Sequence, residues 1–90
     1  HTHVPTYDAR VLKNGTAYQT DAGMSGDYNS VIGMNKENSL NRFMKKDSKK
    51  HIPSEGAASL CGVIVDCDTE TGLANKIEHF IYGGELKNIN

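Results

Sequence analysis

Apolar residues are densest in the last third of the chain, where two apolar segments flank a polar one. The segments at 58–66 and 74–82 are rich in β-favouring residues, and the stretch 68–72 between them holds polar and turn-forming residues. Two glycines at 83–84 end the second segment. This pattern predicts a C-terminal β-hairpin with strands over 58–66 and 74–82.

A helical spacing of apolar residues in the middle of the chain predicts one helix over 36–46. Leu40, Phe43 and Met44 recur at positions i, i+3 and i+4 and form one apolar stripe. Asn35 precedes this segment as a favourable N-cap, because its side-chain oxygen accepts a free backbone N–H of the first turn. We expect the stripe to dock the helix on the sheet.

The N-terminal third of the chain shows weaker periodicity. Residues 1–15 are polar and read as irregular, ending in a turn at Asn14-Gly15. Residues 16–20 alternate and predict a short strand, whereas 21–33 contains three glycines and predicts a loop. The predicted fold is therefore α+β, with a partial sheet, one helix and a C-terminal β-hairpin.

Length and charge exclude several classes of function. A chain of 90 residues supports one small domain, and such a chain buries only about 60–65% of the surface that its unfolded form exposes. A formal net charge of −1 argues against non-specific binding to nucleic acid or to a membrane surface. No apolar run approaches the roughly 18 residues that a membrane span needs. We therefore expect neither a membrane segment nor a nucleic-acid partner.

The two cysteines are predicted to be free thiols. Cys61 and Cys67 lie at the two ends of one predicted strand, so their Cα atoms would be about 20 Å apart. A disulfide tolerates only about 7 Å between Cα atoms. Two unpaired thiols are typical of a reducing compartment, and we expect the protein to be cytoplasmic.

Two charged clusters are assigned structural roles. The basic run Lys45, Lys46, Lys49, Lys50 and His51 has no interleaved aromatic residues, so it is interpreted as a solvated helix exit rather than an RNA contact. The acidic run at 66–70 resembles the start of a calcium loop. That loop needs Gly at its sixth position and Glu at its twelfth, where this chain has Thr71 and Ile77. A hairpin turn is therefore preferred there.

The remaining histidines are treated separately. His79 shares a strand face with Ile77 and Ile81, and we expect it to pack there with its polar edge satisfied. His1 and His3 stand at i and i+2. In an extended segment both side chains would point to one side, about 6.6 Å apart at the backbone. This spacing lets two imidazoles reach one metal ion or two adjacent ions.

The residues that follow this pair resemble one protein family. The matching positions are His1-Thr2-His3-Val4-Pro5-Thr6, Asp8, Arg10, Leu12, Gly15-Thr16-Ala17-Tyr18, Thr20-Asp21, Gly23-Met24, Gly26 and Ser30-Val31-Ile32-Gly33. They resemble the bacterial calcineurin-like metallophosphoesterases of the YmdB-like cyclic-nucleotide phosphodiesterase subfamily. The match is dense over 1–33 and looser beyond. Gln19 and Asp27 depart from the usual pattern of the family.

The resemblance implies a fold and a site. The chain would be the C-terminal portion, residues 1–90, of a single metallophosphoesterase domain that forms a four-layer α/β/β/α sandwich. His1 and His3 would each hold one of two divalent ions, iron or manganese, which activate water against a phosphodiester. The family's other ligands lie upstream, and none of them is in this chain. Substrate contacts are expected from Gly23, Met24 and Gly26, although the glycines could equally serve turn geometry alone.

The expected function is metal-dependent hydrolysis of phosphodiesters such as cyclic nucleotides. We expect the isolated chain to be inactive, with no catalytic residue of its own, and to pair with its own N-terminal portion or with copies of itself. Two alternatives stay open. One is a non-enzymatic segment that binds copper or nickel through the amine, amides and imidazole of His1-Thr2-His3. The other is a structural module whose unpaired strand edges bind a partner chain.

Overall fold

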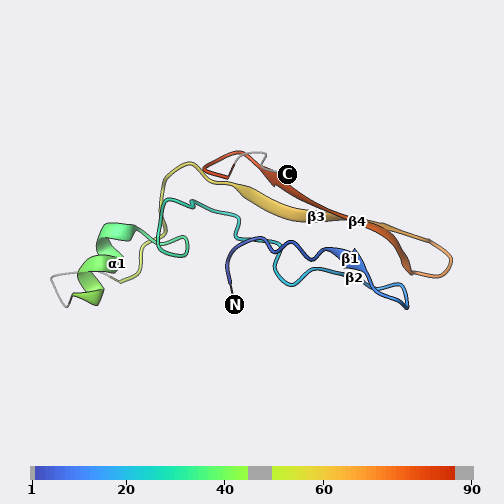
Figure 1. The fold of residues 1–90 in the computed structure, drawn as a ribbon. Helices are drawn as coiled ribbons and strands as arrows, with labels where there is room; N and C mark the ends of the chain where they lie inside the picture. Colours follow the sequence, from blue (N-terminus) through green and yellow to red (C-terminus); the bar gives the residue numbers. More distant parts are fainter. Residues whose placement is uncertain (1, 45–49, 87–90) are drawn as a thin grey trace.

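The computed structural model describes residues 2–44 and 50–86 and has an α+β fold, as predicted. Its elements, in chain order, are β1 (Arg10–Val11), β2 (Ala17–Tyr18), α1 (Lys36–Phe43), β3 (Leu60–Cys67) and β4 (Ala74–Tyr82). The strands form two antiparallel two-stranded sheets, β1 with β2 and β3 with β4. Figure 1 shows the long hairpin above the short one, with the helix at the other end of the molecule.

The C-terminal hairpin is confirmed and forms the longest element pair. Its register runs from Leu60 opposite Tyr82 to Cys67 opposite Ala74, with one irregularity after Asp66. Asp68 shapes the turn, because its carboxylate accepts the N–H groups of Glu70 and Thr71, at 2.8 and 3.1 Å. The acidic residues here therefore serve a turn, as preferred over a calcium loop.

The N-terminal hairpin was only half predicted. β2 lies within the predicted strand at 16–20, whereas β1 lies in a region that the sequence pattern marks as irregular, and that prediction is wrong. The predicted turn is present, with Gly15 at a φ of 91°. Gly15 also accepts the N–H of Ala74 at 2.8 Å, and both β1 and β2 lie against β4. The short hairpin is thus attached along the long one.

A carboxylate joins the two segments on either side of the short hairpin. Asp8 accepts the hydroxyl of Thr6 at 2.6 Å and the N–H of Thr20 at 3.2 Å, and it also accepts the Thr20 hydroxyl. These bonds, led by that of the Thr20 hydroxyl, lower the pKa of Asp8 from 3.8 to about 2. The Arg10 guanidinium lies 5.0 Å from the centre of the Tyr18 ring, a cation–π contact across the β1–β2 pair.

Helix α1 begins where predicted. The side chain of Asn35 accepts the N–H of Asn38 at 2.9 Å, which satisfies one free donor of the first turn. The helix ends at Phe43, and Lys45 and Lys46 lie outside the described residues. The predicted docking is wrong, because Phe43 is 86% exposed and α1 buries no residue. No helix in the described ranges is long and apolar enough to cross a membrane.

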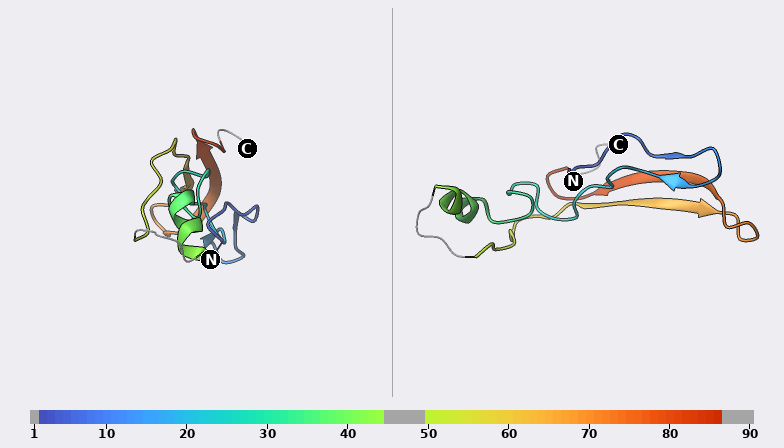
Figure 2. Two further views of the ribbon diagram at one scale, coloured as in Figure 1. Left: turned by 90° about the vertical axis from the view of Figure 1, so that its left-hand side faces the viewer. Right: turned by 90° about the horizontal axis from the view of Figure 1, so that it is seen from below.

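The helix stands away from the strands because a narrow connection holds it there (Figure 2). Two segments, 26–34 and 52–59, run side by side between α1 and the hairpins, and we call them the neck. Isolated β-bridges pair the two segments, including Gly26 with Ser59. The Asp27 carboxylate accepts the Ser54 hydroxyl across the neck. This pairing separates the stripe of α1 from the sheets.

The molecule is elongated and has a minimal core. Its extents are 57 × 22 × 20 Å and its radius of gyration is 17.1 Å, whereas a compact domain of this length would have about 12 Å. Within the described residues, Cys61 and Ile81 are the buried hydrophobic residues. Both cysteines are free thiols, as predicted. So small a core leaves little hydrophobic stabilisation to offset the entropy of ordering the chain.

We predict that Asp8 makes stability depend on pH in the acid range. Because folding lowers the pKa of this carboxyl to about 2, its stabilising effect is complete above its ordinary value of 3.8 and is lost as pH falls through 2. Asp8→Asn should lower the melting temperature at pH 5 and flatten its fall between pH 4 and pH 2. Calorimetry at fixed concentration tests this, with Asp66→Asn, an exposed β3 carboxylate, as control. If the melting temperature fell equally steeply between pH 4 and pH 2 in Asp8→Asn and in wild type, the prediction would be contradicted.

We also predict that the isolated 90-residue chain is ordered only when it associates. Val63 and Val65 are each 38% exposed and Ile64 is 56% exposed on a strand with no charge between 60 and 65, and such strands template pairing with other chains. The melting temperature should therefore rise with concentration, together with the mass from light scattering. A folded monomer with a concentration-independent melt would refute this expectation.

Candidate functional site

The predicted ligand His3 lies at a small cavity beside the glycine-rich loop. This cavity has a volume of about 200 Å³ and is lined by Thr2, His3, Val4, Met24, Tyr28, Ser30 and Ile32. His3 has a φ of 60°, a left-handed conformation that His adopts more readily than most residues. His1 lies outside the described residues. The structure therefore brings two predicted site residues, His3 and Met24, to one cavity.

The segment that carries His3 is anchored through the residue before it. The Thr2 hydroxyl hydrogen-bonds to the Asp21 carboxylate, which also accepts the N–H of Gly23 at 2.8 Å. These two bonds, with the Thr2 hydroxyl as the larger cause, lower the pKa of Asp21. The Asp21 carbonyl accepts the N–H of Thr6 at 3.0 Å. Asp21 thus ties both sides of the His3 segment to the loop.

Tyr28 was not identified as a site residue, yet its hydroxyl lies at the centre of this region. The hydroxyl oxygen accepts the N–H of Met24 at 2.8 Å. It donates to the carbonyl of His3 at 3.4 Å and lies 3.5 Å from the Sγ of Cys61. Burial, followed by the Cys61 contact, raises the pKa of Tyr28 to about 12. The phenol is therefore protonated at neutral pH, as its donation to the His3 carbonyl requires.

The two predicted glycines serve packing and pairing in this structure. Gly23 has a φ of 98°, and a Cβ there would lie 3.0 Å from the Sγ of Cys61 and 3.1 Å from the Cδ of Pro5. Gly26 exchanges two backbone hydrogen bonds with Ser59, at 2.9 and 2.8 Å. Neither glycine is among the residues that line the His3 cavity, whereas Met24 is. Their role in substrate binding stays a prediction.

Asp27 is a buried structural residue. It is 7% exposed, and its carboxylate accepts the N–H of Asn29 at 2.8 Å as well as the Ser54 hydroxyl. The Ser54 bond is the largest cause that lowers the pKa of Asp27. A Cβ at Gly56 would lie 2.2 Å from the Asp27 Oδ2. The carboxylate therefore fits closely against the facing segment of the neck.

The described residues do not complete a metal site. Across 2–44 and 50–86, no three His, Cys, Asp or Glu side chains are grouped closely enough to hold a metal ion. The Nε2 of His79 lies 2.8 Å from the carbonyl of Ala22, which confirms that its polar edge is satisfied. His3 is therefore the one described candidate ligand at the cavity, and any further ligands would have to come from elsewhere.

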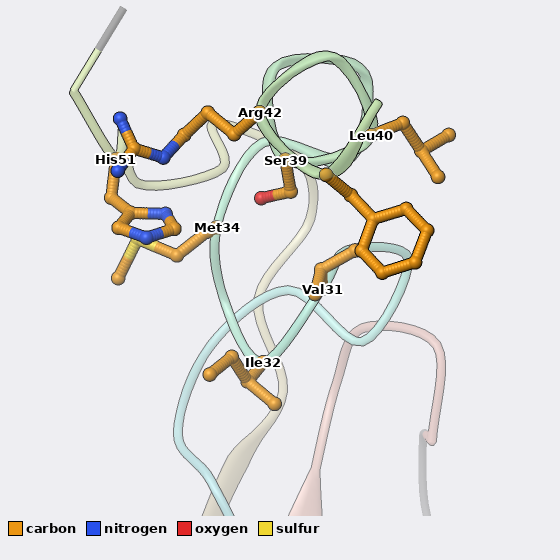
Figure 3. Close-up of a pocket in the computed structure, with 8 residues that line it drawn as sticks. Val31, Ile32, Met34, Ser39, Leu40, Arg42 and His51 are labelled. Atoms are coloured by element: carbon orange, nitrogen blue, oxygen red, sulfur yellow. The ribbon is translucent and has the colours of Figure 1, made fainter. Parts of the chain in front are cut away.

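A second, larger cavity lies between α1 and the turn at 31–34 (Figure 3). It has a volume of about 650 Å³ and is lined by Val31, Ile32, Met34, Ser39, Leu40, Arg42, Phe43 and His51. Leu40 lies on one side, and Arg42 and His51 lie on the other. Ile32 lines both cavities. Its lining, among the residues that the structure describes, is mainly apolar and includes no carboxylate or cysteine.

Comparison with known proteins gives a consistent result. Residues 1–80 match the family model described as YmdB-like protein. A 2',3'-cyclic-nucleotide 2'-phosphodiesterase of Bacillus subtilis (strain 168) is 43% identical over 81 residues, which are 90% of this chain and 31% of that protein.

Two solved structures share the fold over most of the chain. The crystal structure of a novel phosphatase from Mycoplasma pneumoniae is 38% identical with a TM-score of 0.77, over 92% of this chain and 30% of that one. The crystal structure of a hypothetical protein from Thermus thermophilus is 37% identical with a TM-score of 0.75. The match covers 93% of this chain and 32% of that one. The chain thus spans about a third of the length of each of these proteins.

Proposed function

Because the chain belongs to the YmdB-like protein family, we propose that it forms the C-terminal portion of a metal-dependent phosphodiesterase that hydrolyses cyclic-nucleotide phosphodiesters. The observation that carries this proposal is its 43% identity to the Bacillus subtilis phosphodiesterase. The likeness to a solved phosphatase supports the same class of reaction, hydrolysis at phosphorus. The His3 cavity, at the junction of the N-terminal segment and the glycine-rich loop, is the proposed location of the site.

The proposed site needs residues from outside this chain. His3, together with His1, would be a ligand to two divalent ions, iron or manganese. Bound divalent ions would supply positive charge that neutralises the phosphate oxygens. Since the described residues offer one candidate ligand at the cavity, the other ligands would come from an upstream part of the four-layer α/β/β/α domain.

The residues of this chain have a defined part in that arrangement. The anchored segment from Thr2 to Thr6 places His3 in the lining of the cavity, and the glycine-rich loop places Met24 there. The apolar side chains of Val4, Met24 and Ile32 would keep water away from one side of a bound phosphodiester. This chain would therefore bind and orient, and the upstream part would complete the chemistry.

The other partners follow from the same proposal. The exposed apolar residues of β3 would pair with the chain's own N-terminal portion or with further copies. Cys61 and Cys67 are both free, which supports a reducing, cytoplasmic compartment.

We predict that these residues are inactive alone and active when joined to an upstream segment that completes the length of the relatives. The reason is the number of ligands, because one or two imidazoles cannot hold two ions in a fixed geometry. Both proteins are incubated with manganese and bis(p-nitrophenyl) phosphate, and release of nitrophenol is measured. Turnover by the isolated chain above the blank with manganese alone would contradict the proposed division of roles between this chain and the upstream segment.

We predict that His3→Ala lowers metal content and activity in the longer protein, with at least a tenfold loss of metal affinity, about the size seen when a metal site loses a supporting residue. His1→Ala should act in the same way. His51→Ala is the matched control, since this exposed histidine lies at the larger cavity. Metal content is measured by mass spectrometry after dialysis. Full occupancy in both motif variants would refute the assignment of the ligands.

A further inference from the structure

One phenol hydroxyl connects three segments that are distant in sequence. Tyr28 belongs to the glycine-rich loop, His3 to the N-terminal segment and Cys61 to β3, and the Tyr28 hydroxyl reaches both of the others as well as the Met24 N–H. Two of these partners, His3 and Met24, line the proposed site with Tyr28 itself. The hydroxyl therefore lies where the walls of that cavity meet.

The hydrogen bonds of this hydroxyl can all form at once. A tyrosine oxygen has one proton to donate and two lone pairs with which to accept. It accepts from the Met24 N–H at 2.8 Å and donates to the His3 carbonyl at 3.4 Å. The remaining lone pair can accept the Cys61 S–H at 3.5 Å. The polar capacity of the Tyr28 hydroxyl is thus fully used by the site.

The donated bond acts on a residue whose backbone needs support. His3 has a φ of 60°, a conformation that is sparsely populated for residues other than glycine and persists where the surroundings determine it. Its carbonyl is held by Tyr28, and the residue before it is held by Asp21. The Tyr28 bond holds the peptide group that follows the His3 Cα, and the Thr2 hydroxyl anchors the residue before it. Together they restrict the backbone of His3 and so the direction of its side chain.

We propose that Tyr28 is a positioning residue of the phosphodiesterase site, which orients His3 against Met24 through its hydroxyl. The inference rests on the proposed function for its effect on catalysis, and on the structure alone for its effect on His3. Removal of the hydroxyl leaves the aromatic ring in place, so packing is preserved while the orientation is lost. A displacement of about 1 Å at a reacting centre can lower the rate by about a hundredfold.

The experiment compares Tyr28→Phe with Tyr7→Phe in the longer protein. Tyr7 is the matched control because its side chain is fully exposed. Hydrolysis of 2',3'-cyclic AMP is measured, and the His3 imidazole is followed by NMR with labelled histidine, assigned by its loss in His3→Gln. We expect kcat to fall about tenfold to a hundredfold with KM changed less than threefold, and the His3 signal to move. Tyr7→Phe should change neither.

The two readouts separate the two proposals. If the wild-type protein does not hydrolyse the cyclic nucleotide, the proposed function is refuted. If the NMR signal of His3 still moves in Tyr28→Phe and in no other variant, the positioning role of Tyr28 remains intact. A His3 signal and a kcat equal to those of Tyr7→Phe would overturn the positioning role.

A measurement on wild type covers the case in which Tyr28→Phe does not fold. The Met24 amide, bonded to the Tyr28 hydroxyl, should exchange with solvent more slowly than the amide of its exposed neighbour Ser25. Exchange of the Met24 amide at the rate of Ser25 would show that the bond is absent and would overturn the inference.

Discussion

The scarcity of buried apolar surface is the constraint on which the rest of this structure depends. With Cys61 and Ile81 as the buried hydrophobic residues of the described chain, the segments are held together mainly by hydrogen bonds. Bonds at Gly15 and Ala22 attach the N-terminal half to the long hairpin, and bonds at Gly26 join the two segments of the neck. A single bond contributes only about 1 kcal/mol. Order in the chain therefore depends on many small contributions that are distributed along its length.

Three carboxylates concentrate these contributions at particular points. Asp8, Asp21 and Asp27 each accept bonds from hydroxyl and N–H groups of segments that are far apart in sequence, and the pKa of each is lowered in consequence. Asp8 holds the short hairpin, Asp21 holds the segment that carries His3, and Asp27 holds the two segments of the neck together. Charge-assisted bonds are stronger than neutral ones, so these three sites partly replace the core that the chain lacks.

Features that depend on neighbouring residues could be predicted from the sequence, and features that depend on distant pairing could not. The long hairpin, its turn at Asp68 and the Asn35 cap follow from local patterns and local hydrogen bonds. β1 has only two residues, too few for a periodic pattern, and exists through its partner β2. The role of Tyr28 joins three separate segments. Such a junction has no signature in a single stretch of sequence.

The helix stripe illustrates the same limit in another way. The spacing of Leu40, Phe43 and Met44 correctly marks one helical face, but the periodicity of a helix holds no information about what that face meets. Its location is decided by the neck, where Asp27 and Ser54 join the two segments and hold α1 beyond the end of the sheets.

The neck also gives the molecule a mechanical property. Two thin segments connect α1 to the hairpins in a body 57 Å long, so the helix acts as the far end of a lever with its pivot at the bridges between the segments. A small change of angle at the pivot displaces Phe43 by much more than it displaces Gly26. Tyr28, Ser30 and Ile32 line the His3 cavity and also belong to the neck, so bending of the neck would change the shape of one side of that cavity. The neck, and Ile32 within it, therefore couples the position of the helix to the shape of the cavity.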